Sequence, residues 1–107
     1  MIARLWHGRT PIEKAGAYSK FLNARAIPDY QSTPGNLAVH ILRRDAGDAA
    51  HFYTLTFWES LEAIRRFAGD PVARAKYYPE DRDFLLSLEP TVRHYEASAV
   101  LSNAFRT

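Results

Sequence analysis

The chain has 107 residues, of which 47% are apolar and 24% charged, and its formal net charge is +2. This length and balance predict one globular domain with a single core. The net charge is small, and its arginines form short pairs such as Arg43-Arg44 rather than a stripe, which argues against a nucleic-acid partner.

Cysteine is absent, which excludes disulfides, thiolate metal ligands and cysteine nucleophiles. The N-terminus carries a charge at Arg4 and lacks the apolar run of a signal peptide. No segment approaches the roughly 20 apolar residues of a membrane span. We therefore expect a cytoplasmic protein with no membrane partner.

The N-terminal part predicts a strand and then an amphipathic helix. The strand is expected over Ile2 to His7 and is closed by Gly8. The sequence Thr10-Pro11-Ile12-Glu13 has the pattern of a capping box with proline at the first helical position. The helix is expected to run to about Ala26, before Pro28. Its apolar stripe consists of Ala15, Tyr18, Leu22 and Ala26.

The middle of the chain predicts a loop and a hairpin. Two prolines and a glycine predict a loop over residues 28–36. Strands are expected over Leu37 to Arg44 and Ala50 to Trp58. The turn between them, Asp45 to Asp48, contains Gly47, which can adopt a positive φ.

The third strand is apolar on both faces. Tyr53, Leu55 and Phe57 point to one side, and Phe52 and Trp58 point to the other, because strand side chains alternate. The helices of one small domain can cover only one face of the sheet. The strand therefore predicts a homodimer that forms through the other sheet face.

The C-terminal part predicts helices and a last strand. Ser60 can cap a helix that Gly69 ends. A short helix is expected from Asp70-Pro71 until Pro79, and a further helical turn or two from Glu80 to Leu88. The last strand is expected over Thr91 to Ala97. Residues 98–107 form a tail whose apolar members are Val100, Leu101 and Phe105.

This order of elements is that of the ferredoxin-like split βαβ fold, an α+β domain over residues 1–97 with a four-stranded antiparallel sheet and helices on one face. In such a sheet the first strand pairs with both the third and the fourth. Residues near their ends can therefore converge on one cleft.

The sequence carries no metal or cofactor motif. None of the four histidines, at positions 7, 40, 51 and 94, lies within metal-ligand spacing of another. A glycine-rich phosphate loop and a Gly-x-Ser-x-Gly elbow are also missing. We expect neither a metal nor a cofactor.

Aromatic and polar side chains near the strand ends are the candidate site. They suit a flat, hydrophobic or aromatic small molecule. The same residues could serve the core alone, and Asp81 could be only a helix cap. The expected catalytic residues are His7, Trp58, Tyr78 and His94, and the expected substrate-binding residues are Trp6, Phe67, Tyr77 and Asp81.

The segment Phe57-Trp58-Glu59-Ser60-Leu61-Glu62-Ala63-Ile64 resembles the strand-to-helix signature of the antibiotic biosynthesis monooxygenase-like family. The N-terminal Met1 to Gly8 and the C-terminal Val92 to Glu96 are similar to one subgroup, so the resemblance spans residues 1–97. It implies a dimeric α+β barrel. It also implies an activity such as cofactor-free oxygenation of polycyclic phenols, quinol oxygenation or haem degradation.

The resemblance implies roles for two positions. Trp58 matches the tryptophan whose indole N–H donates into the pocket in such enzymes. Phe67 stands where many members have a histidine, and the chain has no histidine from 52 to 93. This difference argues against haem degradation in the known manner.

We therefore expect a cofactor-independent monooxygenase of an aromatic, phenolic or quinol-like compound, with His7 or His94 as the base. The alternatives are a non-catalytic dimer that binds a small ligand or serves as a stress-related module, and an oxygen-independent isomerase or decarboxylase. Convergence of His7, Trp58, Tyr78 and His94 on one cleft favours an enzyme. Placement on different surfaces favours the binding module.

Overall fold

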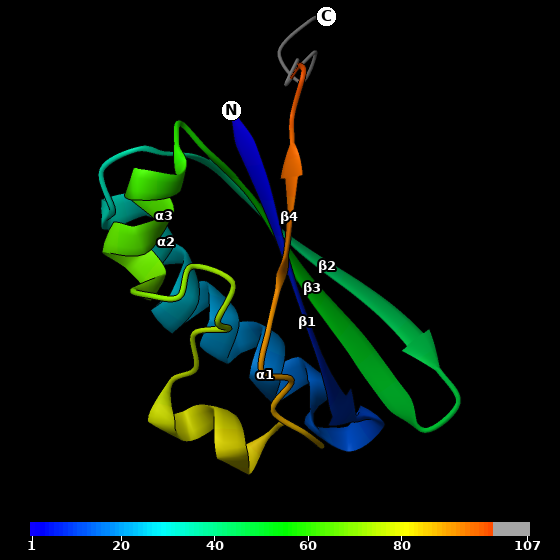
Figure 1. Ribbon diagram of the computed structural model, residues 1–107. Helices are drawn as coiled ribbons and strands as arrows, with labels where there is room; N and C mark the ends of the chain where they lie inside the picture. The colour runs from blue at the N-terminus through cyan, green and yellow to red at the C-terminus, as the bar shows by residue number, and fades with distance from the viewer. Residues whose placement is uncertain (100–107) are drawn as a thin grey trace, which may run out of the picture.

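The computed structural model describes residues 1–99, which form a four-stranded antiparallel sheet with helices on one face (Figure 1). The strand order is β2-β3-β1-β4, so the first strand pairs with the third and the fourth as predicted. This confirms the ferredoxin-like α+β fold. The strands are β1 (Ile2–Pro11), β2 (Asn36–Ala46), β3 (Ala49–Trp58) and β4 (Arg93–Glu96).

The predicted hairpin is present between β2 and β3. Ala46 pairs with Ala49, and Gly47 has a φ of 63° in the turn between them. Glycine adopts this conformation without the steric cost that a Cβ brings.

The predicted capping box at the first helix is wrong. β1 continues to Pro11 because Thr10 still pairs with Ala50 in the sheet. The Thr10 hydroxyl donates to the Pro11 carbonyl and does not accept from the amide of Glu13. A 3₁₀ turn, η1 (Ile12–Lys14), then leads into α1 (Ala15–Phe21).

The helix passes through Pro28, so the predicted loop is wrong for its first five residues. α1 is followed by a π-helical turn, η2 (Leu22–Ala26), and by α2 (Ile27–Ser32) (Figure 1). Proline has no amide hydrogen and clashes with the carbonyl four residues earlier in a regular α-helix. The wider π turn changes the bonding pattern just before Pro28, which then occupies the first turn of α2.

The core lies between the helices and the sheet. The predicted stripe of the first helix is buried and faces Phe52 and Trp58 of β3. α3 (Leu61–Ala68) begins as predicted, because the Ser60 hydroxyl accepts a 3.2 Å hydrogen bond from the Ala63 amide. It ends at Gly69, whose φ is 79°.

The short helix expected from Asp70-Pro71 is absent from the described chain, and this part is irregular apart from a bridge between Arg74 and Thr91. Arg4 explains why such a segment is stable here. Arg4 is only 2% exposed, and its guanidinium donates to the carbonyl oxygens of Val72 (2.8 Å) and Arg74 (2.9 Å). These two carbonyls lie outside any helix, so Arg4 supplies the hydrogen bonds that a helix would have given them. The expected helical turn beyond is η3 (Pro79–Asp83).

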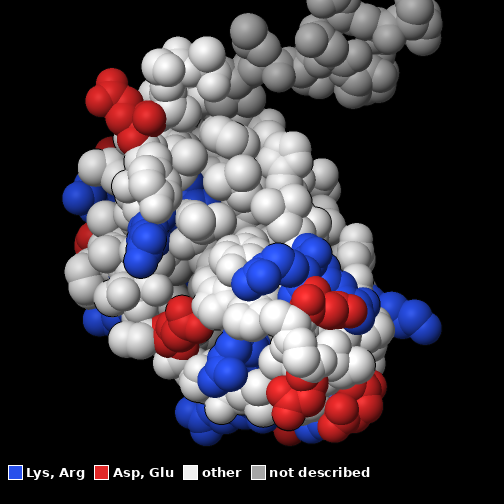
Figure 2. Space-filling view, turned by 90° about the vertical axis from the view of Figure 1, so that its right-hand side faces the viewer, with Lys and Arg blue, Asp and Glu red and all other residues white. Residues whose placement is uncertain are grey.

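The other face of the sheet has no covering layer among residues 1–99. Tyr53, Leu55 and Phe57 lie there, as the alternation predicted, beside Leu42 of β2, which is 46% exposed. In Figure 2 the upper right of the molecule is largely uncharged, whereas charged side chains lie along its left side and below. No helix in the described part is long and apolar enough to span a bilayer. The apolar tail residues Val100, Leu101 and Phe105 lie outside the described residues.

Candidate functional site

A small, partly open cavity lies between the helices and the sheet. Its volume is about 20 Å³, the room that about one water needs. Its walls are mainly aromatic, with one lysine and one carboxylate. The lining residues are Trp6, Tyr18, Leu22, Ala26, Tyr30, Thr54, Lys76, Tyr78 and Asp81.

Trp6 lines this cavity and also carries an unpaired donor. Its indole Nε1 is buried and has no hydrogen-bond partner among residues 1–99. Burial raises the pKa of Tyr77, and the nearby Trp6 N–H partly offsets this, but the two groups do not reach hydrogen-bond geometry. Buried hydrogen-bond donors are rarely left unpaired, so the Trp6 N–H is a candidate to bind an acceptor on a ligand.

Gly8 makes room for the Trp6 indole. A Cβ on Gly8 would lie only 2.5 and 2.6 Å from two carbons of the Trp6 six-membered ring. Only glycine therefore permits this placement of the indole against β1.

Asp81 is a buried carboxylate at the start of η3. It accepts hydrogen bonds from the Tyr18 hydroxyl (2.9 Å) and from the Tyr78 amide (2.7 Å). Burial raises its pKa, and the two hydrogen bonds only partly offset this. Asp81 thus caps η3, one of the two roles considered for it, and also lines the cavity.

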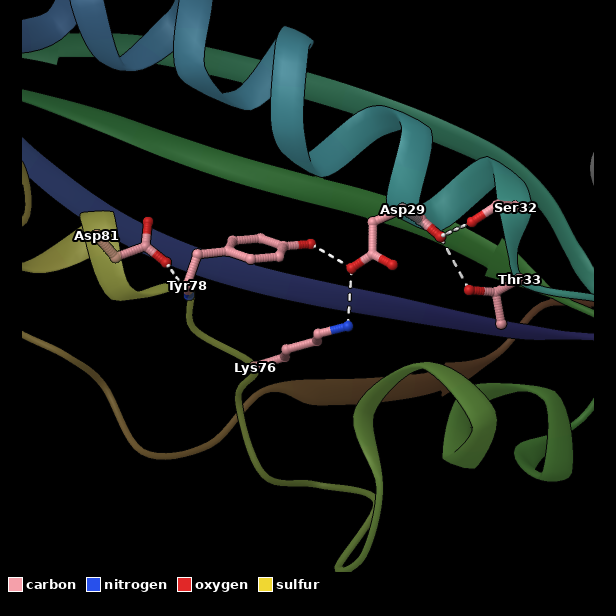
Figure 3. Close-up of polar contacts among 6 residues, drawn as sticks. All are labelled: Asp29, Ser32, Thr33, Lys76, Tyr78 and Asp81. Carbon is pink, nitrogen blue, oxygen red and sulfur yellow. Dashed lines mark hydrogen bonds and ion pairs between the residues drawn. The ribbon is translucent and has the colours of Figure 1, made fainter.

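Tyr78 is fixed at both ends (Figure 3). Asp81 holds its amide, and its hydroxyl donates to Asp29 Oδ2 at 2.5 Å. Lys76 Nζ donates to the same oxygen at 2.7 Å. Burial opposes ionisation of Asp29, but the hydrogen bonds from Lys76 and Tyr78 outweigh it and lower the pKa of Asp29.

Trp58 and Phe67 lie deeper in the core. The Trp58 indole is completely buried, and its N–H donates to the hydroxyl of Thr56 at 2.8 Å. Phe67 packs against Trp58 and stacks on Tyr30 with ring centroids 4.4 Å apart. Neither Trp58 nor Phe67 lines the cavity, and the predicted donor role of Trp58 stays a prediction.

His94 contacts the buried arginine. Arg4 Nη1 lies 3.0 Å from His94 Nε2, and because a guanidinium only donates, this nitrogen accepts and carries no proton. Burial and the charge of Arg4 lower the pKa of His94. The imidazole does not line the cavity.

His7 lies on the opposite face of the sheet. Its Nδ1 is 2.6 Å from Glu89 Oε2, and its Nε2 is 2.8 Å from His51 Nδ1. A hollow of about 280 Å³ beside it also includes Tyr53 and Arg93. The expected convergence of the four catalytic candidates therefore does not occur, although Trp6, Tyr78 and Asp81 do come together.

Sequence reasoning missed two polar residues of the site. Asp29 fell in a segment expected to be a loop, and Lys76 in one expected to be a helix. The adjacent Tyr77-Tyr78 pair was the one signal that pointed to this part of the chain. Among residues 1–99, no three histidines or carboxylates are grouped to hold a metal ion.

Comparison with solved structures shows the same fold at low identity. The haem degrader MhuD from Mycobacterium tuberculosis, with two haems in its active site, superposes with a TM-score of 0.64 at 20% identity, covering 95% of this chain and 100% of that one. An arginine-to-serine variant of MhuD, with two manganese protoporphyrins IX per active site, gives 0.60 at 20% identity, with 95% and 99% covered.

SnoaB, a cofactor-independent oxygenase from Streptomyces nogalater, gives a TM-score of 0.53 at 19% identity, covering 96% of this chain and 97% of that one. No curated protein sequence matches the chain. The family model described as antibiotic biosynthesis monooxygenase matches residues 9–75, which is more than half of the chain. The chain therefore belongs to the antibiotic biosynthesis monooxygenase family.

Proposed function

We propose that this protein is a monooxygenase of a flat aromatic, phenolic or quinol-like compound, and that its substrate binds between the helices and the sheet. Family membership supports monooxygenase-type chemistry. The observation that carries the site is that Trp6, whose buried N–H is unpaired, lines one aromatic cavity together with Asp81. A substrate oxygen would give this donor the partner that it lacks.

We assign the role of base to Asp81 because neither His7 nor His94 lines the cavity. A carboxylate whose pKa is raised by burial is closer to the pKa that general-base catalysis near neutral pH requires. Asp81 would take a proton from an activated CH₂ group of the substrate. The carbanion would then reduce O₂, and CH₂ and O₂ together would give a carbonyl and water. The substrate supplies all the electrons, and the Trp6 N–H stabilises the developing oxyanion.

Entry of a substrate requires Tyr78 to move. Tyr78 lines the 20 Å³ cavity and also an outer hollow of about 520 Å³, together with Tyr77 and Leu88. Tyr78 is therefore a lining residue that the two spaces share. A flat ligand would bind where displacement of Tyr78 joins them.

A histidine-held haem does not fit these residues. All four histidines belong to the described chain, and none lines the cavity. The proposed reaction therefore involves no haem, although MhuD has this fold.

We also propose that two copies pair through the uncovered sheet face. Leu42, Leu55 and Phe57 lie on that face, and a stable pair needs about 800 Å² from each partner. The cytoplasmic location stays a prediction from composition.

A non-catalytic ligand-binding module is the second candidate. The observation in its favour is that His7 and Trp58 lie on different sides of the sheet. An oxygen-independent isomerase or decarboxylase would use the same carboxylate without O₂.

Oxygen uptake with a panel of anthrones, naphthols and quinols tests the proposal. We expect uptake by the wild type that Asp81→Asn lowers by at least about a hundredfold, the scale of a general base. Asp83→Asn, an exposed neighbour on η3, is the matched control and keeps the wild-type rate. Uptake that Asp81→Asn leaves unchanged contradicts the base assignment. Tight binding without uptake favours the binding module.

A further inference from the structure

Two cations lie beside Tyr78, a residue that lines the cavity. The Lys76 ammonium and the Arg25 guanidinium both lie at the Tyr78 ring, 5.7 and 4.6 Å from its centroid. Asp29 is the one carboxylate bonded to Lys76 among the described residues. Two cations and the Asp29 carboxylate thus lie around the Tyr78 ring, and the Asp81 carboxylate lines the cavity beside them.

The Lys76 ammonium has hydrogen-bond donors that its pair with Asp29 does not use. An ammonium group carries three N–H donors, and the hydrogen bond to Asp29 uses one of them. The Lys76 side chain is 30% exposed, so it is neither sealed in the core nor extended into water. A ligand can engage it without breaking the pair with Asp29.

An aromatic surface lies directly under this ammonium. Lys76 Nζ is 4.2 Å from the centroid of the Phe67 ring, which stacks on Tyr30. Tyr30 lines the cavity together with Lys76. The same place thus offers a flat apolar wall and a fixed positive charge.

We propose that the ligand of this cavity is an aromatic carboxylic acid, whose carboxylate Lys76 binds while its ring lies against Tyr30 and Tyr78. This inference rests on the proposed site and adds a substrate class to it. The Asp29 carboxylate, which accepts from both Lys76 and the Tyr78 hydroxyl, shows the kind of group that these two donors hold.

A carboxylate suits the site better than a neutral phenol. An aromatic carboxylic acid is ionised throughout the neutral pH range, whereas a phenol with a pKa near 10 is almost fully protonated there. A charge-assisted hydrogen bond is about twice as strong as a neutral one, so a permanent anion gains the most.

Arg4 positions the segment that carries Lys76. Its hydrogen bonds to the carbonyls of Val72 and Arg74 hold the irregular chain against β1. The Ala75 amide adds a 2.9 Å hydrogen bond to the carbonyl of Pro90. Lys76 is thus presented by a fixed backbone, which reduces the entropy lost when a ligand binds.

Calorimetric titration with naphthoate and its uncharged amide tests the inference. The two probes share a ring and differ in charge. We expect the wild type to bind naphthoate about tenfold more tightly than the amide, the effect of one charge-assisted hydrogen bond. Lys76→Met should abolish this preference. Lys20→Met, at an exposed site on α1, is the matched control and should keep it.

Asp29→Asn is the second variant. The amide oxygen can still accept from Tyr78, but Lys76 loses its counter-ion, so naphthoate should bind more tightly. This variant gives an answer even if Lys76→Met fails to fold.

The outcomes separate this inference from the proposed function. Equal binding of the two probes to the wild type overturns the carboxylate inference and leaves the oxygenase proposal intact. A preference that depends on Lys76, without oxygen uptake on any acid or phenol, supports the inference and contradicts the oxygenase proposal. Failure of both probes to bind overturns the aromatic-acid site.

Discussion

At the scale of single residues, the site depends on how Trp6 is held. Its indole occupies space that exists only because Gly8 has no side chain, and its N–H has no hydrogen-bond partner among residues 1–99. Asp81 and Asp29 fix Tyr78 beside it. The cavity is therefore formed by local contacts that strand and helix patterns do not reveal.

Gly8→Ala should destabilise the protein. The new Cβ would overlap the Trp6 ring, and overpacking of this kind costs about 1–3 kcal/mol. Chemical denaturation measures the loss. Gly16→Ala is the control, because a Cβ at that position would meet no atom within 4 Å and alanine favours a helix. Equal stabilities of the two variants would show that the Trp6 indole does not press on Gly8.

The sequence predicted some site residues and not others for a physical reason. Trp6, Tyr78 and Asp81 follow from aromatic and acidic side chains near strand ends. Lys76 and Asp29 meet across 47 positions of sequence, and no local pattern encodes that contact. His7 and His94 were predicted as the base because histidine titrates near neutral pH. The face of the sheet to which a histidine points depends on its position along the strand, and chemical type does not reveal that position.

At the scale of elements, local signals worked where local forces dominate. The hairpin at Gly47 and the cap at Ser60 were predicted because turn and cap chemistry lie within four residues. The predictions at Thr10 and Pro28 were wrong because sheet pairing extended β1 and a π turn carried the helix past the proline. Tertiary context overrode propensity at both positions.

Ser60→Ala should cost about 1 kcal/mol of unfolding free energy, because the Ala63 amide loses its cap. The exposed Ser87→Ala is the comparison and should change stability little. Thermal unfolding of both variants gives the answer. An unchanged melting temperature for Ser60→Ala would mean that water replaces the cap at no cost.

At the scale of the whole molecule, the two faces of the sheet differ in what covers them. One face and the helices enclose the proposed substrate site, and the other carries Leu42, Leu55 and Phe57, where we propose that a second copy pairs. The two-sided apolar strand in the sequence already indicated this division.

Leu42→Glu should convert the proposed dimer into monomers, because a charge would be buried at the pairing face. Leu42 is 46% exposed in one chain, so the monomer should still fold. Leu86→Glu, at a residue that is 50% exposed, is the control and should stay dimeric. Sedimentation velocity distinguishes the two. A monomeric wild type, or a dimeric Leu42→Glu, would contradict pairing through this face.

Stability should fall at mildly acidic pH. Burial and Arg4 lower the pKa of His94, so the folded state binds its proton less readily than the unfolded state, where the pKa is about 6.5. The stabilisation from neutral His94 is therefore complete above about pH 6.5 and is lost as the pH falls through the lowered value. His94→Gln keeps an acceptor for Arg4 but does not titrate. Urea unfolding over this pH range should show a shallower slope for the variant, and identical slopes would contradict the assignment.

The central claim is that the ligand binds between the helices and the sheet, beside Trp6. The chain has two tryptophans, so its NMR spectrum contains two indole N–H signals, which Trp6→Phe assigns. Titration with naphthoate should move the Trp6 signal strongly and the Trp58 signal little, because the Trp58 N–H is already bonded to Thr56. Saturable binding that leaves the Trp6 signal in place would show that the ligand occupies another surface and would contradict this account.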